Sequence, residues 1–164
     1  MRTHKQLVKV QDVIAKAIEL LGPGGQYWIT GDEHVKQGDE RQDTFCMVGV
    51  LDKAAGELHA SLEVEQRAFV AVAQELPEKY RRRVNLTTTS RDDYSGQFES
   101  NLEFAADNAR EAIPRFNDSL PSTEALYEDV QGNLRFKRSR RPKGFKQVKS
   151  VFCKALKKTV AKDI

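Results

Sequence analysis

One unbroken apolar run constrains the fold more than any other stretch of the chain. It covers residues 45–51, Phe-Cys-Met-Val-Gly-Val-Leu, and it is followed by Asp-Lys-Ala-Ala and Gly56. Such a run must be buried on all sides, and its length fits a strand as well as a helix. The flanks favour a helix, because Asp43 is a suitable N-cap, alanine favours helix, and glycine suits the left-handed residue after a helix. We therefore predict a central buried helix over 44–56, with the other apolar segments packed around it.

Amphipathic patterns predict the other helices. Apolar residues recur at the i, i+3, i+4 spacing of one helix face in five further segments: residues 4–21, 61–76, 98–113, about 122–130 and 145–162. Pro114 is expected to end the third of these, because proline cannot donate the next helical hydrogen bond. The length of 164 residues, with 39% hydrophobic residues, suits one core better than two. We predict a mainly α fold, a single compact helical domain of about five helices over 1–133, with a short β-hairpin near Trp28 and Thr87.

Charge divides the chain into an acidic body and a basic tail. Residues 1–134 hold 15 Lys and Arg against 23 Asp and Glu, whereas residues 135–164 hold 12 Lys and Arg against Asp163 alone. We expect the tail to consist of a basic linker, 134–144, and a basic amphipathic helix, 145–164. This asymmetry favours either an anionic partner for the tail or docking of the tail on the acidic surface of its own body.

Several partners are compatible with the tail. Clustered Lys and Arg neutralise phosphates, and Phe136 and Phe145 can stack on bases, which favours nucleic acid without distinguishing DNA from RNA. The apolar face of the helix suits instead an acidic protein surface or the protein's own body. A basic amphipathic helix can also lie on an anionic membrane surface. The side chains expected to contact nucleic acid or a protein partner are Arg135, Lys137, Arg138, Arg140, Arg141, Lys143, Lys146, Lys149, Lys154, Lys157 and Lys158.

A second class of function rests on Cys46. In the first turn of the predicted central helix, unpaired backbone N–H groups and the helix dipole would favour a thiolate. His34 would act as its base, oriented by Asn117 or Asp118, as in cysteine-dependent enzymes. Free cysteine is nevertheless often buried in cores, and no signature of a cysteine-enzyme family surrounds Cys46, so we expect a structural role. Since metal-ligand spacings are also missing, we expect no metal and no cofactor.

Four short stretches together resemble a family of small bacterial and bacteriophage proteins of unassigned function. They are Leu20-Leu21-Gly22-Pro23, Trp28-Ile29-Thr30-Gly31, the apolar run 45–51, and Ile113-Pro114-Arg115-Phe116-Asn117-Asp118. The resemblance covers roughly residues 7–131 and leaves out the basic tail. It implies a mostly helical domain in which the Trp-Gly, Cys-Gly and Asn-Asp segments come together, and it implies a phage origin. It implies no activity, because the family has none assigned.

These patterns predict a small intracellular accessory protein, phage-encoded if the resemblance holds. No stretch approaches the roughly 20 apolar residues of a membrane helix, and the N-terminus lacks the apolar segment of a signal peptide. We therefore expect no membrane span and a location in the host cytoplasm or the virion. The predicted function is non-enzymatic binding of nucleic acid or of an acidic protein surface. The alternatives are the cysteine-dependent enzyme and a structural virion or assembly component, an oligomer anchored by its tail.

Overall fold

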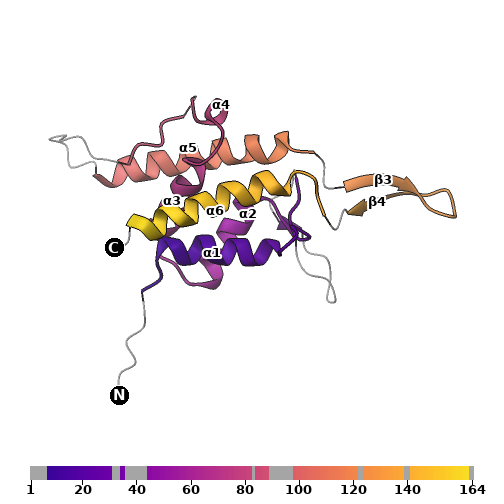
Figure 1. Cartoon of the computed structure of the whole chain (residues 1–164), viewed down its shortest axis with the longest axis horizontal. Helices are drawn as coiled ribbons and strands as arrows, with labels where there is room; N and C mark the ends of the chain where they lie inside the picture. Colours follow the sequence, from indigo (N-terminus) through magenta and orange to yellow (C-terminus); the bar gives the residue numbers. More distant parts are fainter. Residues whose placement is uncertain are drawn as a thin grey trace, which may run out of the picture.

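Six helices and two short antiparallel hairpins form the described part of the chain (Figure 1). The computed structural model describes residues 7–30, 34–35, 44–82, 84–88, 98–121, 124–138 and 141–162. Its helices are α1 (Val10–Leu21), α2 (Met47–Glu57), α3 (Leu62–Ala73), α4 (Glu78–Arg81), α5 (Phe98–Ser119) and α6 (Phe145–Lys162). Strands β1 (His34–Val35) and β2 (Thr44–Phe45) form one hairpin, and β3 (Glu124–Glu128) and β4 (Leu134–Arg138) form the other. The prediction of a mainly α fold is confirmed.

The hydrophobic core lies where α2 packs against α1, α3 and α5, and α6 completes it by packing against α1 and α3. The first five residues of α2 are all buried, and so are both of its alanines. α1 contributes the apolar stripe predicted from its spacing, and it runs beside α6 (Figure 1). α3 begins where predicted, because the Ser61 hydroxyl accepts a hydrogen bond from the Val64 N–H at 3.2 Å. The predicted central helix is therefore confirmed, and the helices around it form one compact domain.

The central helix begins later than predicted, because the residues before it are extended in β2. The Phe45 N–H donates to the Tyr27 carbonyl at 2.8 Å, and the Phe45 carbonyl accepts from the Ile29 N–H at 2.9 Å. These two bonds attach the start of the apolar run to a distant segment of the chain. The N-cap is consequently Cys46, whereas the predicted N-cap, Asp43, lies outside the described residues.

Two predicted helix ends are wrong. α2 continues past Gly56, and the left-handed residue that follows it is His59, at φ 53°. α5 passes through Pro114 and continues for five more residues. Proline removes the hydrogen bond of its own nitrogen, and its ring crowds the carbonyl four residues earlier, so the continued helix must be stabilised by other contacts. The buried side chains of Phe116 and Asn117 hold the turn that follows against the core and stabilise the continued helix.

The described chain between α5 and α6 contains a hairpin where a helix was predicted over 122–130, and β4 occupies the first five residues of the linker predicted over 134–144. Five residue pairs join β3 to β4, and residues 122–123 lie outside the described part. In the turn, the Asp129 carboxylate accepts hydrogen bonds from two backbone N–H groups, both at 2.9 Å, and Gly132 adopts φ 82°. The glycine therefore lies in the turn that joins β3 to β4, and it does not end a helix. Figure 1 shows this hairpin extending away from the helices.

Within the described residues, Trp28 and Thr87 do not form the short hairpin that was predicted near them. Trp28 makes an isolated parallel bridge with Phe45, while Thr87 belongs to no strand. The strand partner of Phe45 on its other side is His34. The aromatic segment is therefore paired with β2, just before the central helix, rather than with the chain after α4.

Candidate functional site

The apolar face of α6 is buried within the protein's own core. Phe145, Val148, Val151, Phe152 and Ala155 are all buried, and the helix packs against α1 and α3. This arrangement corresponds to the predicted docking of the tail on its own body. The face is consequently not available to a protein partner or a membrane surface. No helix in the described part of the chain, α6 included, has the length and hydrophobicity needed to cross a lipid bilayer.

The part of the α6 surface that is not buried is basic. The helix contains six lysines and no acidic residue over 18 residues, a length of about 27 Å. Within the described residues, only Lys158 of this set has an ion-pair partner, since its Nζ lies 2.7 Å from Oε1 of Glu75. All six lysines are exposed: Lys146, Lys149, Lys154, Lys157, Lys158 and Lys162. We call this set the lysine face.

The remaining basic residues predicted to bind are only partly placed. Arg141 and Lys143 are exposed immediately before α6. Arg135, Lys137 and Arg138 belong to β4, whose backbone is described, although their side chains are not. Arg140 lies outside the described residues. The structure thus leaves the predicted α6 lysines exposed around the unburied part of the helix, and it leaves the side chains of the hairpin undescribed.

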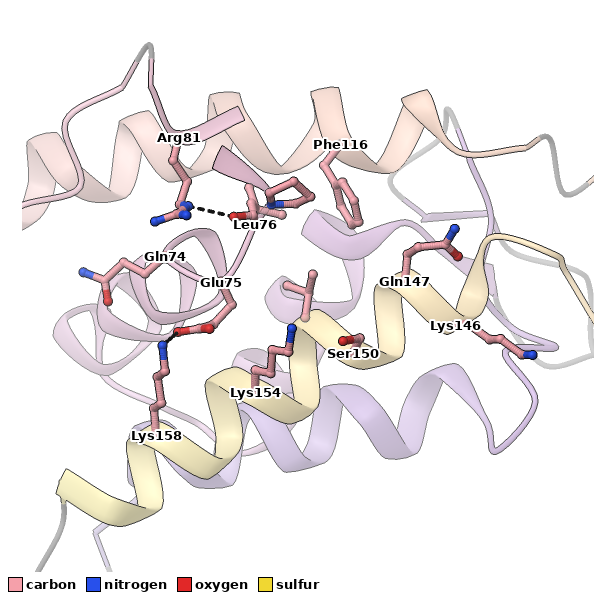
Figure 2. A pocket seen from close by; sticks show the side chains of 12 residues that line it. Gln74, Glu75, Leu76, Arg81, Phe116, Lys146, Gln147, Ser150, Lys154 and Lys158 are labelled. Carbon is pink, nitrogen blue, oxygen red and sulfur yellow. Dashed lines mark hydrogen bonds and ion pairs between the residues drawn. The ribbon is translucent and has the colours of Figure 1, made fainter. Parts of the chain in front are cut away.

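A groove of about 540 Å³ lies between α6 and the segment that joins α3 to α4 (Figure 2). Arg81 lines it from one side, and Lys146, Lys154 and Lys158 line it from α6. Glu75 is the one carboxylate among its lining residues, so the formal charge of the lining is +3. Its volume is in the range of small-ligand pockets. This groove is a cationic site with one anionic residue at its edge.

One wall of the groove is fixed by the backbone. The Arg81 Nε–H donates to the Leu76 carbonyl at 2.7 Å, which anchors the guanidinium group beside the groove. The apolar part of the lining consists of Leu76, Pro77, Phe116 and Val151. Sequence reasoning missed this site, because it could not assign residues 77–96. The run of three arginines at 81–83 was its one visible signal.

Asn117 joins the three segments that the resemblance was expected to bring together. Its Oδ1 accepts hydrogen bonds from the Trp28 Nε1–H at 2.8 Å and from the Met47 N–H at 3.1 Å. Its Nδ2 donates to the Ile29 carbonyl at 3.2 Å and to Asp118 Oδ1 at 3.1 Å. These are the four hydrogen bonds that an amide side chain can make. The expected convergence of the Trp-Gly, Cys-Gly and Asn-Asp segments is confirmed, and no bond of Asn117 is left to orient a histidine.

Cys46 is adjacent to this junction. It is 6% exposed, and its Sγ accepts a hydrogen bond from the Gly49 N–H at 3.4 Å, so the thiol caps the helix that it precedes. The backbone of His34 is paired with Phe45, one residue before the cysteine, but its side chain is not described. The side chain of Asp118, the second candidate for orienting the histidine, is exposed. The described geometry gives Cys46 and Asn117 roles in packing and capping.

The family model described as "Family of unknown function (DUF6197)" matches residues 6–127. No curated protein and no solved structure shows a significant match to the chain. The matched residues include Trp28, Cys46 and Asn117, which meet in the fold, whereas α6 and its lysine face follow the matched region. Because the match covers well over half of the sequence, this chain belongs to the family of unknown function DUF6197.

Proposed function

We propose that this protein is a non-enzymatic accessory protein that binds nucleic acid through the lysine face of α6. The observation that supports the proposal is that α6 buries its apolar face in the core and presents six exposed lysines, without an acidic residue, to solvent. A solvent-exposed row of cations along a helix attracts a polyanion and releases its counterions. A phage origin, and a role in assembly, rest on the sequence resemblance alone and remain predictions.

The buried apolar face favours nucleic acid over an acidic protein as the partner. A protein that binds a basic amphipathic helix usually gains its affinity from the apolar side of that helix. Here that side packs against α1 and α3, so only the charged side is available. Lysines alone suit the phosphate backbone, which is a regular row of charges and requires no apolar contact.

The test is a titration of labelled single-stranded and duplex oligonucleotides with the full-length protein, followed by fluorescence anisotropy. The key variant is Lys149→Gln/Lys157→Gln, which removes two exposed charges of the lysine face and leaves the buried face intact. The matched control is Lys16→Gln/Lys53→Gln, which removes two charges from the α1–α2 surface, where both lysines pair with Glu57.

The proposal predicts that the lysine-face variant binds nucleic acid markedly more weakly than the wild type, and that the control retains wild-type affinity. Equal weakening of both variants would mean that only the net charge of the protein matters. A wild-type protein that does not bind any oligonucleotide at about 0.1 M salt would contradict the proposal. Binding of a strongly acidic protein in its place would assign the lysine face to a protein partner.

A further inference from the structure

We infer that the groove between α6 and the α3–α4 segment binds one strand of a single-stranded nucleic acid, an inference that rests on the proposed function and specifies its substrate. In this arrangement a backbone phosphate lies between Arg81 and Lys154, and the neighbouring base contacts the apolar lining. Figure 2 shows the two cationic groups on opposite sides of the groove, Arg81 on α4 and Lys154 on α6.

The cations of the groove are arranged for a phosphate. Because Arg81 uses its Nε–H on the Leu76 carbonyl, the side chain is held in place while its terminal N–H groups can bind an anion. Lys154 and Lys146 line the facing wall and, within the described residues, have no ion-pair partner. The fixed guanidinium group and the ammonium groups on their flexible stems can therefore hold an anion between two elements of the fold.

The rest of the lining favours a single strand over a duplex. Pro77 is an exposed apolar residue of the lining, and Leu76, Phe116 and Val151, which are almost fully buried, form the rest of its apolar part. In a duplex the bases are stacked inside and only phosphates would reach this surface, whereas an unstacked base of a single strand can contact apolar side chains. Gln147 and Ser150 add an amide and a hydroxyl group that can hydrogen-bond the edge of that base.

The ion pair at one end of the groove limits its affinity for anions. Glu75 is almost fully buried, with 9% of its side chain exposed, and it holds the Lys158 ammonium at 2.7 Å. A carboxylate in the lining repels a phosphate and also occupies one of the four cations. Removing this carboxylate while keeping its shape should raise the charge of the lining from +3 to +4 and release Lys158 for the ligand.

The inference is tested with a labelled oligodeoxythymidine of about 12 nucleotides and with a duplex of the same length, on full-length protein. Arg81→Gln should weaken single-strand binding roughly tenfold, the effect of losing a charged hydrogen bond. Arg82→Gln, at the next position, is the matched control, because Arg82 pairs with Glu78 and does not line the groove. Glu75→Gln should strengthen binding roughly threefold, the opposite of what a merely destabilised fold would give.

The outcomes separate this inference from the proposed function. Suppose that Lys149→Gln/Lys157→Gln weakens binding, but that Arg81→Gln binds like Arg82→Gln and Glu75→Gln binds like the wild type. The nucleic acid then lies on the outer lysine face, and the groove assignment is wrong. Duplex binding as tight as single-strand binding would also overturn it. If the wild-type protein binds neither probe, the proposed function fails and the groove assignment fails with it.

Discussion

Replacing Asn117 by Asp should destabilise the fold far more than the loss of one side-chain nitrogen suggests. An aspartate at this position still accepts hydrogen bonds from the Trp28 and Met47 N–H groups. It can no longer donate to the Ile29 carbonyl, which then faces a carboxylate oxygen, and it places a second negative charge beside Asp118. The substitution therefore keeps the shape of the side chain and replaces its hydrogen-bond donor, Nδ2, by an acceptor oxygen.

The expected cost follows from the hydrogen bonds that the substitution removes. Two hydrogen bonds donated by Nδ2 disappear, and the Ile29 carbonyl loses its buried partner, which together cost about 2–4 kcal/mol. In a protein of this size each kcal/mol lowers the melting temperature by roughly 2–4 °C, so a decrease of about 5–15 °C is expected. Protonation of the new carboxyl group restores a donor, and the deficit should therefore shrink as the pH falls.

Urea and thermal unfolding measure this effect, and the emission of Trp28, the single tryptophan, reports on the junction itself. The matched control is Asn108→Asp, on the same helix, where the amide makes one hydrogen bond, to the Asn85 carbonyl at 2.9 Å, near the surface. Similar melting temperatures for the two variants, at neutral and at acidic pH, would refute the assignment of Asn117 as the junction of the three segments.

Three further predictions concern α6, the thiols and the Asp52–Glu65 pair. Phe152→Ala should lower the free energy of unfolding in urea by about 3–5 kcal/mol, because this fully buried ring attaches α6 to the core. A small alkylating reagent should modify the exposed Cys153 rapidly and the buried Cys46 only at the rate of unfolding, as mass spectrometry of the intact protein can show. Burial, followed by the hydrogen bond and the charge of Asp52, raises the pKa of Glu65 above its ordinary value of 4.5, although Arg110 opposes the shift. Wild-type stability relative to Glu65→Gln should therefore increase as the pH falls through the raised pKa and level off near 4.5.

Each of these three predictions has a control or a result that would contradict it. Val160→Ala, at a half-exposed position of the same helix, should cost less than about 0.5 kcal/mol. If Phe152→Ala lowers the free energy of unfolding no more than Val160→Ala does, α6 is not part of the core. Rapid alkylation of Cys46 in the folded protein would reopen its interpretation as a nucleophile. A stability difference between wild type and Glu65→Gln that is independent of pH would contradict the raised pKa.

Local patterns predicted the helices well, because amphipathic spacing depends on neighbours within a few turns. The first helix and α6 with its apolar face followed from that spacing, and the central helix followed from its apolar run and the residues that flank it. The start of α2 did not, because the extended conformation of Phe45 depends on backbone bonds to Tyr27 and Ile29. The β3–β4 hairpin was missed for a related reason, since its strands gain their hydrogen bonds only across the turn at Gly132.

The candidate site was predictable only in part. The lysines of α6 were recognised from composition, and their exposure followed from the position of the apolar face on the helix. The groove was not recognised, because Arg81 and Lys154 are far apart in the sequence and become neighbours of one cavity only when α6 packs beside α3. Because the apolar face of α6 is buried, ending the chain at Asn133 would remove α6 and expose the core. Charge-neutralising substitutions are therefore the proper test of the lysine face.

The salt dependence of nucleic-acid binding tests the central claim most directly. The dissociation constant for a single-stranded oligonucleotide is measured against salt concentration for the wild type and for Lys149→Gln/Lys157→Gln. If these lysines neutralise phosphates, the slope of log affinity against log salt should be smaller in magnitude by about 1.4 in the variant, or about 0.7 for each phosphate that is no longer neutralised. Identical slopes for the two proteins would show that the exposed face of α6 does not bind the nucleic acid.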